Sequence, residues 1–400
     1  MALMPVAEAK ARILEAAKPL PAETVALESA QGRVLAKDVA ATRNQPPFPA
    51  SAMDGYAVRA ADVADVPARL QVIGASIAGK RYAGKVGPGK AVRIFTGAPV
   101  PEGADTIVIQ EDADRDGDTV VVRERMAVNR HIRPAGLDFR KGETVLTQGM
   151  VLNARLLGLA AAMNREGLPV RRKPVVAILS TGDELVRPGD KPGPDQIIAS
   201  SAPALAAFAR RFGAEPLMLG IVPDRKAVIA RAIEKGRKAD ILLTTGGASV
   251  GEHDLVQEAL AAAGVKLDFW KIAMRPGKPL MFARRGQQRI LGLPGNPVSS
   301  LVCARIFVKP LIDRLLGLPV DDGLVPAVLD APLAANDQRE DYLRATFVAT
   351  KEGLPRVTAH GKQDSSMQRT LAFSDCLIVR APFAPAAAAG ERVEVLPLDF

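Results

Sequence analysis

Short apolar runs alternate with amphipathic stretches between residues 175 and about 317. Such runs are typical of strands buried on both faces of a parallel sheet, and a 3.6-residue period of apolar positions predicts helices between them. The predicted strands are Val175–Leu179, Pro216–Ile221, Ile241–Leu243, Val265–Ile272 and Ile290–Leu293, and the predicted helices are Ala202–Phe212, Asp224–Lys235, Leu255–Ala263 and Val298–Leu316. This alternation predicts a central three-layer α/β domain with a mostly parallel sheet.

The flanking segments follow other patterns. Residues from about 56 to 140 alternate and turn repeatedly, which predicts a small β-rich domain, and residues from about 324 to 400 predict a C-terminal β domain. The predicted strands are Leu70–Ile73, Ala91–Phe95, Thr106–Ile109, Thr119–Arg123, Leu324–Leu329, Arg344–Ala349, Cys376–Val379 and Arg392–Val395. Helical patterns cover Val6–Ala17, Leu27–Val34 and Val151–Met163, and Arg171–Pro174 reads as a linker. No chemistry can be argued from the C-terminal segment.

Composition narrows the class of protein. A chain of 400 residues with 48% hydrophobic and 24% charged residues is an ordinary globular protein of more than one domain. Its 2 cysteines exclude a disulfide framework, and its 3 histidines lie far apart, which disfavours a transition-metal site. Early charges at Glu8 and Lys10 do not fit a secretory signal, and no apolar run approaches the ~18 residues of a membrane span. We therefore expect a cytoplasmic protein.

The charge balance is basic, with 53 Lys and Arg against 44 Asp and Glu, a net charge of +9. The basic residues are spread along the chain, aromatic residues make up only 4%, and no nucleic-acid-binding motif is present. We therefore expect no nucleic-acid partner, and a small polyanionic ligand explains the charge at least as well.

The stretch Ile241–Asp254 carries the most informative motif. A buried strand ends in Thr244 and Thr245, and two glycines and a helical pattern follow. Glycine-loop N–H groups beside a helix N-terminus form an anion cradle. Carboxylates at the same edge suit a hard cation that bridges phosphates. The competing interpretation is a tight turn in which Asp254 caps a helix.

Two other predicted strands end in similar loops. Ser180–Glu184 follows Val175–Leu179 with a glycine and two acids, and Pro294–Pro297 follows Ile290–Leu293. The carboxyl ends of parallel strands meet at one edge, which is where open α/β sheets bind ligands. The sequence therefore predicts a site at this edge.

Rigid loops supply further candidates. Met274–Pro279 holds Arg275 and Lys278 close together between prolines and a glycine, which favours anion binding over simple solvation. A stiff, proline-rich loop presents Asp54, although a surface Asp-Gly hairpin is the favoured explanation when this stretch is taken alone. No dinucleotide-binding glycine motif and no Walker A sequence is present, which disfavours an oxidoreductase or a P-loop kinase.

Together these motifs resemble the MoeA family, whose animal homologue is the E domain of gephyrin. The resemblance runs through nearly the whole chain, in Pro46–Ala57, Thr96–Pro99, Ser180–Leu185, Thr245–Asp254, Arg275–Pro279 and Leu293–Ser299. It implies a molybdopterin molybdenumtransferase, which inserts molybdate into adenylylated molybdopterin in a Mg²⁺-dependent step that releases AMP. It also implies a homodimer, and partners that include a molybdopterin adenylyltransferase and cofactor-delivery proteins.

The resemblance further implies four domains. They span residues 1–45 with 141–172 as an elongated helical domain, 46–140 as an inserted β-rich domain, 173–318 as the molybdopterin-binding α/β domain, and 319–400 as the C-terminal β domain. The site acids come from distant segments, so a cleft between domains or between protomers is expected.

Site residues follow from the same resemblance. The implied catalytic residues are Asp54, Thr96, Asp138, Glu184, Asp224 and Asp254, of which Glu184, Asp224 and Asp254 are implied to hold the metal. The implied substrate-binding residues are Gly246, Gly247, Ser249, Lys271, Arg275, Lys278, Pro294 and Pro297. Two positions depart from the family. Arg275 stands where many members have lysine, and Pro223-Asp224 stands where many have an acidic pair, which leaves the role of Asp224 open.

Two other functions compete with this interpretation. A binding scaffold, as in gephyrin, would not need nearly every acid and cation loop intact. A nucleotide hydrolase of the CinA type would share only the central α/β domain, so the motif Pro46–Ala57, which lies outside that domain, argues against it.

Overall fold

The structure is a computed structural model that describes residues 3–246, 255–348 and 353–400. The chain divides into two compact units, one formed by Met1–Glu23 with Arg171–Phe400 and the other by Thr24–Val170. In the described part of the chain, no helix is both long and apolar enough to cross a bilayer.

The first unit contains the expected parallel sheet, with strand order β16-β13-β17-β21-β20-β18. Its strands are β13 (Val175–Thr181), β16 (Glu215–Val222), β17 (Ile241–Thr245), β18 (Leu267–Trp270), β20 (Met281–Arg285) and β21 (Gln288–Leu293). The first four strands of this order are parallel, whereas β20 pairs antiparallel with both β21 and β18. The hydrophobic pattern alone does not indicate β20.

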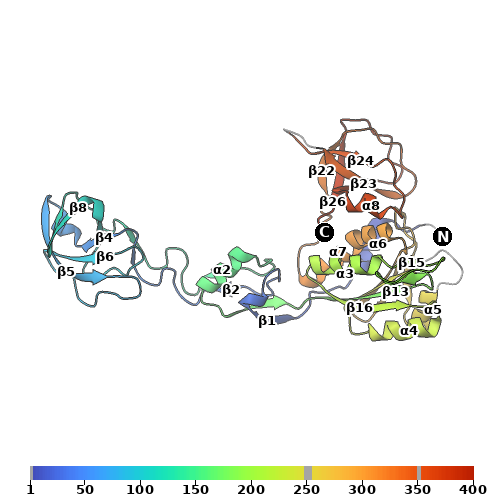
Figure 1. The fold of residues 1–400 in the computed structure, drawn as a ribbon, viewed down its shortest axis with the longest axis horizontal. Coiled ribbons are helices and arrows are strands. Elements are labelled where there is room, and N and C mark those ends of the chain that lie inside the picture. The colour runs from blue at the N-terminus through green and yellow to red at the C-terminus, as the bar shows by residue number, and fades with distance from the viewer. Residues whose placement is uncertain (1–2, 247–254, 349–352) are drawn as a thin grey trace. The chain divides into compact units, whose positions relative to one another are not determined.

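Helices cover both faces of this sheet (Figure 1). One face carries α3 (Ser201–Arg211), α6 (Pro297–Cys303) and α7 (Lys309–Leu316), and the other carries α4 (Lys226–Lys235) and α5 (Leu255–Ala262). The core under α4 and α5 joins Ile229 and Ile233 to Leu260 and to the strand residues Leu179 and Leu242. The helix α1 (Val6–Leu14) contacts α7. Removal of these apolar side chains from water is what holds the three layers together.

Two predicted helices differ from those observed. The helix expected over Val298–Leu316 is interrupted by a π-helical turn, Ala304–Val308. Pro310 follows this turn and has no N–H to donate to the carbonyl four residues earlier, so regular α-helical bonding cannot continue through it. The helix expected from Asp224 begins at Lys226, with Arg225 at its N-cap and no side-chain cap bond, so Asp224 lies before the helix.

A second sheet of the same unit has the order β19-β23-β24-β22-β26-β25, and β23 also pairs with β25, which closes it into a barrel. Its strands are β19 (Met274–Arg275), β22 (Val325–Leu329), β23 (Glu340–Val348), β24 (Arg356–Ala359), β25 (Cys376–Arg380) and β26 (Arg392–Pro397). The short helix α8 (Gln368–Ala372) lies between β24 and β25 in the chain, and the short strands β14 (Leu185–Val186) and β15 (Ile197–Ile198) pair with each other. Because β19 comes from the loop Met274–Pro279, this sheet fixes that loop.

The second unit contains a six-stranded sheet of order β7-β4-β6-β5-β9-β8. Its strands are β4 (Gly55–Val58), β5 (Ala68–Ser76), β6 (Lys90–Ile94), β7 (Thr106–Ile109), β8 (Ala113–Asp116) and β9 (Thr119–Val122). Shorter pairs join β1 (Ala22–Ala26) to β12 (Gly167–Arg171), β2 (Val39–Ala40) to β11 (Thr144–Leu146) and β3 (Ala50–Ser51) to β10 (Ile132–Arg133). The helix α2 (Ala154–Ala162) is capped by the Asn153 side chain, which accepts from Leu156 N–H at 3.1 Å.

The helix expected over Leu27–Val34 is wrong, because only Leu27–Ser29 forms a 3₁₀ turn. Gly32 then takes φ +73°, and Val34 bridges Val151 instead of continuing a helix. The backbone groups of this segment therefore hydrogen-bond to distant parts of the unit.

Candidate functional site

Three strand ends meet at the carboxyl edge of the parallel sheet. The strands β13, β17 and β21 are adjacent and parallel, with Ser180 beside Thr245 and Thr245 beside Leu293. The loops Ser180–Glu184, Thr245–Gly246 and Pro294–Pro297 therefore leave the sheet side by side. The convergence that the sequence predicted is present.

A cavity of about 530 Å³ opens at this edge. Its lining is Ser180, Thr181, Glu184, Leu185, Ile197, Ile198, Ala199, Ser200, Ser201, Thr245, Gly246, Gly295, Asn296, Pro297, Ser366 and Gln368. Three of the predicted site residues, Glu184, Gly246 and Pro297, belong to it. Pro294 lies directly before it and its carbonyl accepts a hydrogen bond from the Ser300 hydroxyl. Predicted residues Gly247, Ser249 and Asp254 lie outside the described residues.

The cavity floor is tightly packed. Gly246 takes φ +87°, and a Cβ on it would lie 2.2 Å from the Thr181 carbonyl oxygen, so this position admits only glycine without a backbone shift. The buried hydroxyls of Ser180 and Thr245 bond to each other at 3.0 Å. The Thr181 hydroxyl is also buried, but it has no hydrogen-bond partner among the described residues.

The acids of the site come from two neighbouring strand ends. Gly182 N–H donates to the Val222 carbonyl at 3.2 Å, and Asp224 N–H donates to the Asp183 carboxylate at 3.3 Å. These bonds bring the exposed acids Asp183, Glu184 and Asp224 to the same region of the edge. The sequence analysis did not select Asp183 for a role, although it lies in the same loop as Glu184.

A hard cation fits this donor set. The region offers carboxylate and hydroxyl oxygens, and Mg²⁺ usually takes only one or two carboxylates, with phosphate and water completing its shell. No group of three His, Cys, Asp or Glu side chains that could hold a metal occurs within 3–246, 255–348 and 353–400.

The C-terminal segment also reaches the cavity, contrary to the expectation that it carries no arguable chemistry. Ser366 and Gln368 line it, and the Asn296 amide donates to Ser365 Oγ at 2.6 Å. The buried side chain of Arg344, on β23, holds this loop, because its Nη1 donates to the Asp364 carbonyl at 2.8 Å. Burial lowers the pKa of the Arg344 guanidinium. The polar run around Ser365 and Ser366 was visible in the sequence, but nothing local indicated where it would lie.

Among the predicted cationic residues, Arg275 forms ion pairs with acidic residues of the C-terminal barrel. It stands beside Asp341 in the β19–β23 pairing, and its Nε donates to Asp341 Oδ1 at 2.7 Å. It also pairs with Asp337 at 3.3 Å, and these carboxylates raise the pKa of Arg275, chiefly through the hydrogen bond that Arg275 donates to Asp341. Lys271 takes φ +81°, and its ammonium lies 4.1 Å from the centre of the Trp270 ring. Lys278 is exposed and makes no ion pair with another described residue.

This difference predicts distinct effects of two alanine substitutions. Arg275→Ala should lower the free energy of unfolding by about 1–2 kcal/mol, because it leaves the buried Asp341 carboxylate without its ion-pair partner. The expected loss is smaller than for a fully buried pair, since solvent screens the exposed part of Arg275. Lys278→Ala should leave the melting temperature unchanged and weaken binding of the anionic substrate, with a shallower salt dependence than the wild type. Thermal melts and titrations at several salt concentrations measure both. Equal affinity and equal salt slope for Lys278→Ala would remove that lysine from the site.

In the second unit, Asp54 and Thr96 are brought together. Asp54 Oδ1 accepts the Thr96 backbone N–H at 2.7 Å and its hydroxyl at 2.8 Å. These two bonds, the backbone one first, lower the pKa of Asp54, and Arg93 adds to the effect. Arg93 lies between the Tyr56 and Phe95 rings and donates to the Gly55 carbonyl at 3.2 Å. Asp138 is exposed, and its backbone N–H donates to the Gln45 carbonyl at 2.9 Å.

Thr96→Val should raise the pKa of Asp54 toward its ordinary value, because the hydroxyl bond to the carboxylate is lost while the backbone bond remains. Since the folded-state pKa is depressed, an activity that needs the carboxylate is lost as the pH falls through that pKa. The acid limb of the pH profile should therefore move to higher pH in Thr96→Val and stay in place in Thr96→Ser. Carbon NMR titration of the Asp54 carboxyl measures the shift, and identical titrations in all three proteins would contradict the assignment.

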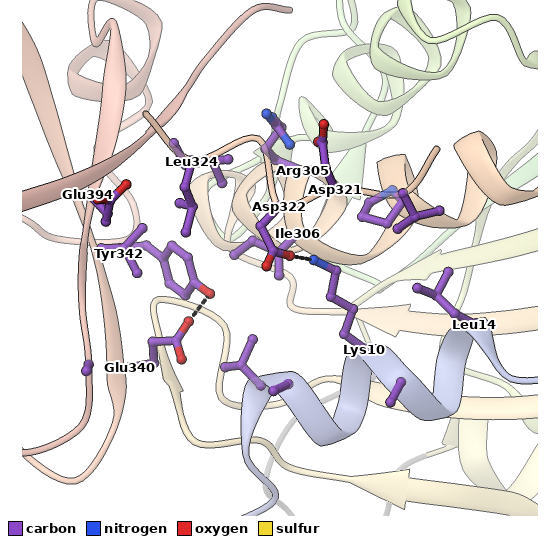
Figure 2. A pocket seen from close by; sticks show the side chains of 18 of the residues that line it. Lys10, Leu14, Arg305, Ile306, Asp321, Asp322, Leu324, Glu340, Tyr342 and Glu394 are labelled. Carbon is purple, nitrogen blue, oxygen red and sulfur yellow. Dashed lines mark hydrogen bonds and ion pairs between the residues drawn. The ribbon is translucent and has the colours of Figure 1, made fainter. Parts of the chain in front are cut away.

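A larger cavity, about 710 Å³, lies elsewhere in the first unit, between α1, the π-helical turn and the C-terminal barrel. Figure 2 shows the Tyr342 hydroxyl bonded to Glu340 and the Lys10 ammonium paired with Asp322 at its wall. Burial, with the Glu340 charge, raises the pKa of Tyr342. This cavity contains none of the predicted site residues, so the strand-end cavity is the candidate site despite its smaller volume.

Comparison with known proteins gives matches along most of the chain. Three family models match the chain: "MoeA N-terminal region (domain I and II)" at residues 4–164, "Probable molybdopterin binding domain" at 177–314, and "MoeA C-terminal region (domain IV)" at 326–398. The second model contains most of the strand-end cavity, and the third contains the loop with Ser366 and Gln368.

Relatives and solved structures cover the whole chain. A protein of Haemophilus influenzae named molybdopterin molybdenumtransferase is 35% identical over 403 residues, 98% of each chain. Molybdopterin molybdenumtransferase 2 of Mycobacterium tuberculosis is 36% identical over 401 residues, 97% of each chain. The crystal structure of a molybdopterin biosynthesis MoeA protein from Pyrococcus horikosii is similar with a TM-score of 0.86 and 29% identity over 100% of both chains.

Proposed function

Because this chain belongs to the MoeA family, we propose that it is a molybdopterin molybdenumtransferase that inserts molybdate into adenylylated molybdopterin and releases AMP. The observation that best supports this activity is the cavity where the glycine-rich ends of β13, β17 and β21 meet inside the matched molybdopterin-binding region. Family membership over residues 4–164 also counts against a hydrolase that shares only the central domain.

The acids of the strand ends would hold Mg²⁺. We assign this role to Glu184 and Asp224, with Asp254 as a third candidate from the sequence. When bound, the ion neutralises charge on the pyrophosphate that links molybdopterin to AMP. The protein's own part is to present the exposed carboxylates of Glu184 and Asp224 at the edge of the sheet.

The remaining residues would position anions. Molybdate, pyrophosphate and the substrate phosphate are all negatively charged, so exposed Lys278 is the cation best placed to attract them by long-range charge. The Asp341 pairing of Arg275 limits that residue mainly to fixing the loop. Pro294 and Pro297 keep the third loop rigid beside the cavity.

The wider setting is also part of the proposal. We expect a homodimer in the cytoplasm. It would receive its substrate from a molybdopterin adenylyltransferase and pass its product to cofactor-delivery proteins. Division of the chain into the four predicted domains belongs to the same proposal.

The deciding experiment incubates the protein with adenylylated molybdopterin, molybdate and Mg²⁺. AMP is quantified, and the product is tested for its ability to activate a cofactor-free molybdenum enzyme. We expect AMP and active cofactor to appear together, and neither to form when molybdate is omitted. Failure of the complete mixture to release AMP would contradict the proposed activity.

A further inference from the structure

One hydroxyl in the candidate cavity has no protein partner. Thr181 is the last residue of β13, its side chain is only 1% exposed, and it lines the cavity. Its Oγ1 has no hydrogen-bond partner among the described residues, although a buried hydroxyl without one is unfavourable. Its neighbours Ser180 and Thr245 satisfy each other at 3.0 Å, so hydroxyls at this edge do pair where geometry allows it.

A second buried hydroxyl serves as a control, because it is packed in the same sheet but does not line the cavity. Thr244 lies on the adjacent strand β17, is 0% exposed and also has no partner among the described residues. It does not line the cavity. The two threonines therefore share residue type, sheet and a buried hydroxyl without a described partner, and they differ in that only Thr181 lines the cavity.

The described lining also indicates which part of a ligand the cavity takes. Glu184 is the only ionisable side chain in it, and the other polar groups are hydroxyls and amides. Leu185, Ile197 and Ile198 supply apolar surface from β14 and β15. Such a lining suits a flat, neutral ring with hydrogen-bonding atoms, and offers no cation to a phosphate or molybdate.

We propose that the Thr181 hydroxyl hydrogen-bonds to the neutral heterocyclic part of the substrate, which is seated in this cavity. This inference rests on the proposed function, because that function supplies a substrate with such rings. Either its pterin or its adenosine has the required chemistry. The anionic groups of the substrate then lie toward the cavity mouth, where Glu184 is exposed.

The test compares Thr181→Val, Thr181→Ser and Thr244→Val. Valine keeps the shape of threonine and removes the hydroxyl. With molybdate omitted, we expect Thr181→Val to bind adenylylated molybdopterin about tenfold more weakly than wild type, as for loss of one hydrogen bond, Thr181→Ser to stay near wild type, and Thr244→Val to stay within about twofold. Both valine variants should melt at or above the wild-type temperature, because each removes an unpaired buried hydroxyl.

Two neutral probes identify the ring. Competition by 6-hydroxymethylpterin and by adenosine, neither of which carries a phosphate, is measured against bound adenylylated molybdopterin in wild type and in Thr181→Val. The probe that contacts Thr181 should lose affinity in the variant, and the other should not. Equal binding of adenylylated molybdopterin and of both probes by Thr181→Val and Thr244→Val would overturn the inference.

Binding is measured without turnover, so the two proposals fail separately. A wild-type protein that binds adenylylated molybdopterin but releases no AMP would contradict the activity, and the threonine comparison would still decide the role of Thr181. A wild-type protein that does not bind adenylylated molybdopterin would overturn the inference as well. Normal AMP release by all four proteins with unchanged affinities would retain the activity and remove Thr181 from the site.

Discussion

Glu184→Gln should slow AMP release about 100-fold or more while leaving the melting temperature nearly unchanged. Glutamine keeps the size of the side chain and removes the single ionisable group of the described cavity lining. Loss of a carboxylate from a hard-cation site removes a few kcal/mol of transition-state stabilisation, and each ~1.4 kcal/mol is a factor of ten in rate. Glu184 is exposed, so the fold does not depend on its charge.

The matched control is Asp190→Asn, which removes one negative charge from an exposed acid between β14 and β15, outside the cavity lining. Among the described residues, its carboxylate accepts only the Arg187 N–H, at 3.2 Å. Turnover should stay within about twofold of wild type, since exposed charges of this kind contribute little. Initial rates over a range of Mg²⁺ concentrations measure both variants. Wild-type rates in Glu184→Gln, or equal losses in the two variants, would show that Glu184 has no special role.

Gly246→Ala should destabilise the protein by about 3 kcal/mol or more and abolish substrate binding. A left-handed residue other than glycine costs roughly 1–2 kcal/mol, and a clash in a packed region typically adds 1–3 kcal/mol. Gly246 meets both conditions, with φ +87° and a Cβ that would lie 2.2 Å from the Thr181 carbonyl oxygen. To admit a methyl group, the ends of β13 and β17 must separate, which deforms the cavity floor.

Gly264→Ala is the control that measures the free-energy cost of the left-handed backbone conformation alone. Gly264 takes φ +72°, and nothing lies within 4 Å of the position of its Cβ. Its substitution should therefore cost only about 1 kcal/mol and leave substrate affinity intact. Urea unfolding gives both free energies. Equal destabilisation by the two substitutions would mean that the backbone at Thr181 moves away from a methyl group at residue 246 at no cost in free energy.

Local sequence was sufficient to predict the frame of the site. Apolar runs that end at Thr181, Thr245 and Leu293 predicted strands, and the glycines and prolines after them predicted loops. Both signals act within a few residues, because strand formation depends on an unbroken apolar run and turn formation on the allowed φ of one or two residues. Parallel order then followed from the helices between the strands.

Helix ends were less predictable because they depend on competition for backbone hydrogen bonds. Leu27–Val34 has the composition of a helix, yet Val34 bonds across to Val151. The π-helical turn Ala304–Val308 precedes Pro310, which lacks an N–H for the helical hydrogen bond. A prediction from apolar positions alone takes no account of that missing donor.

The sequence by itself determined the family, the strand-and-loop frame and the identity of the glycine at position 246. Tertiary structure alone decided which charges are free, because Arg275 and Lys278 look alike in one loop and only packing places Asp341 beside Arg275, 66 residues away. It also decided that the Ser366 loop lines the cavity and that Thr181 lacks a partner there. The physical reason is range: backbone preferences act between neighbours in the chain, whereas pairing and desolvation of side chains depend on segments that meet only when the chain is folded.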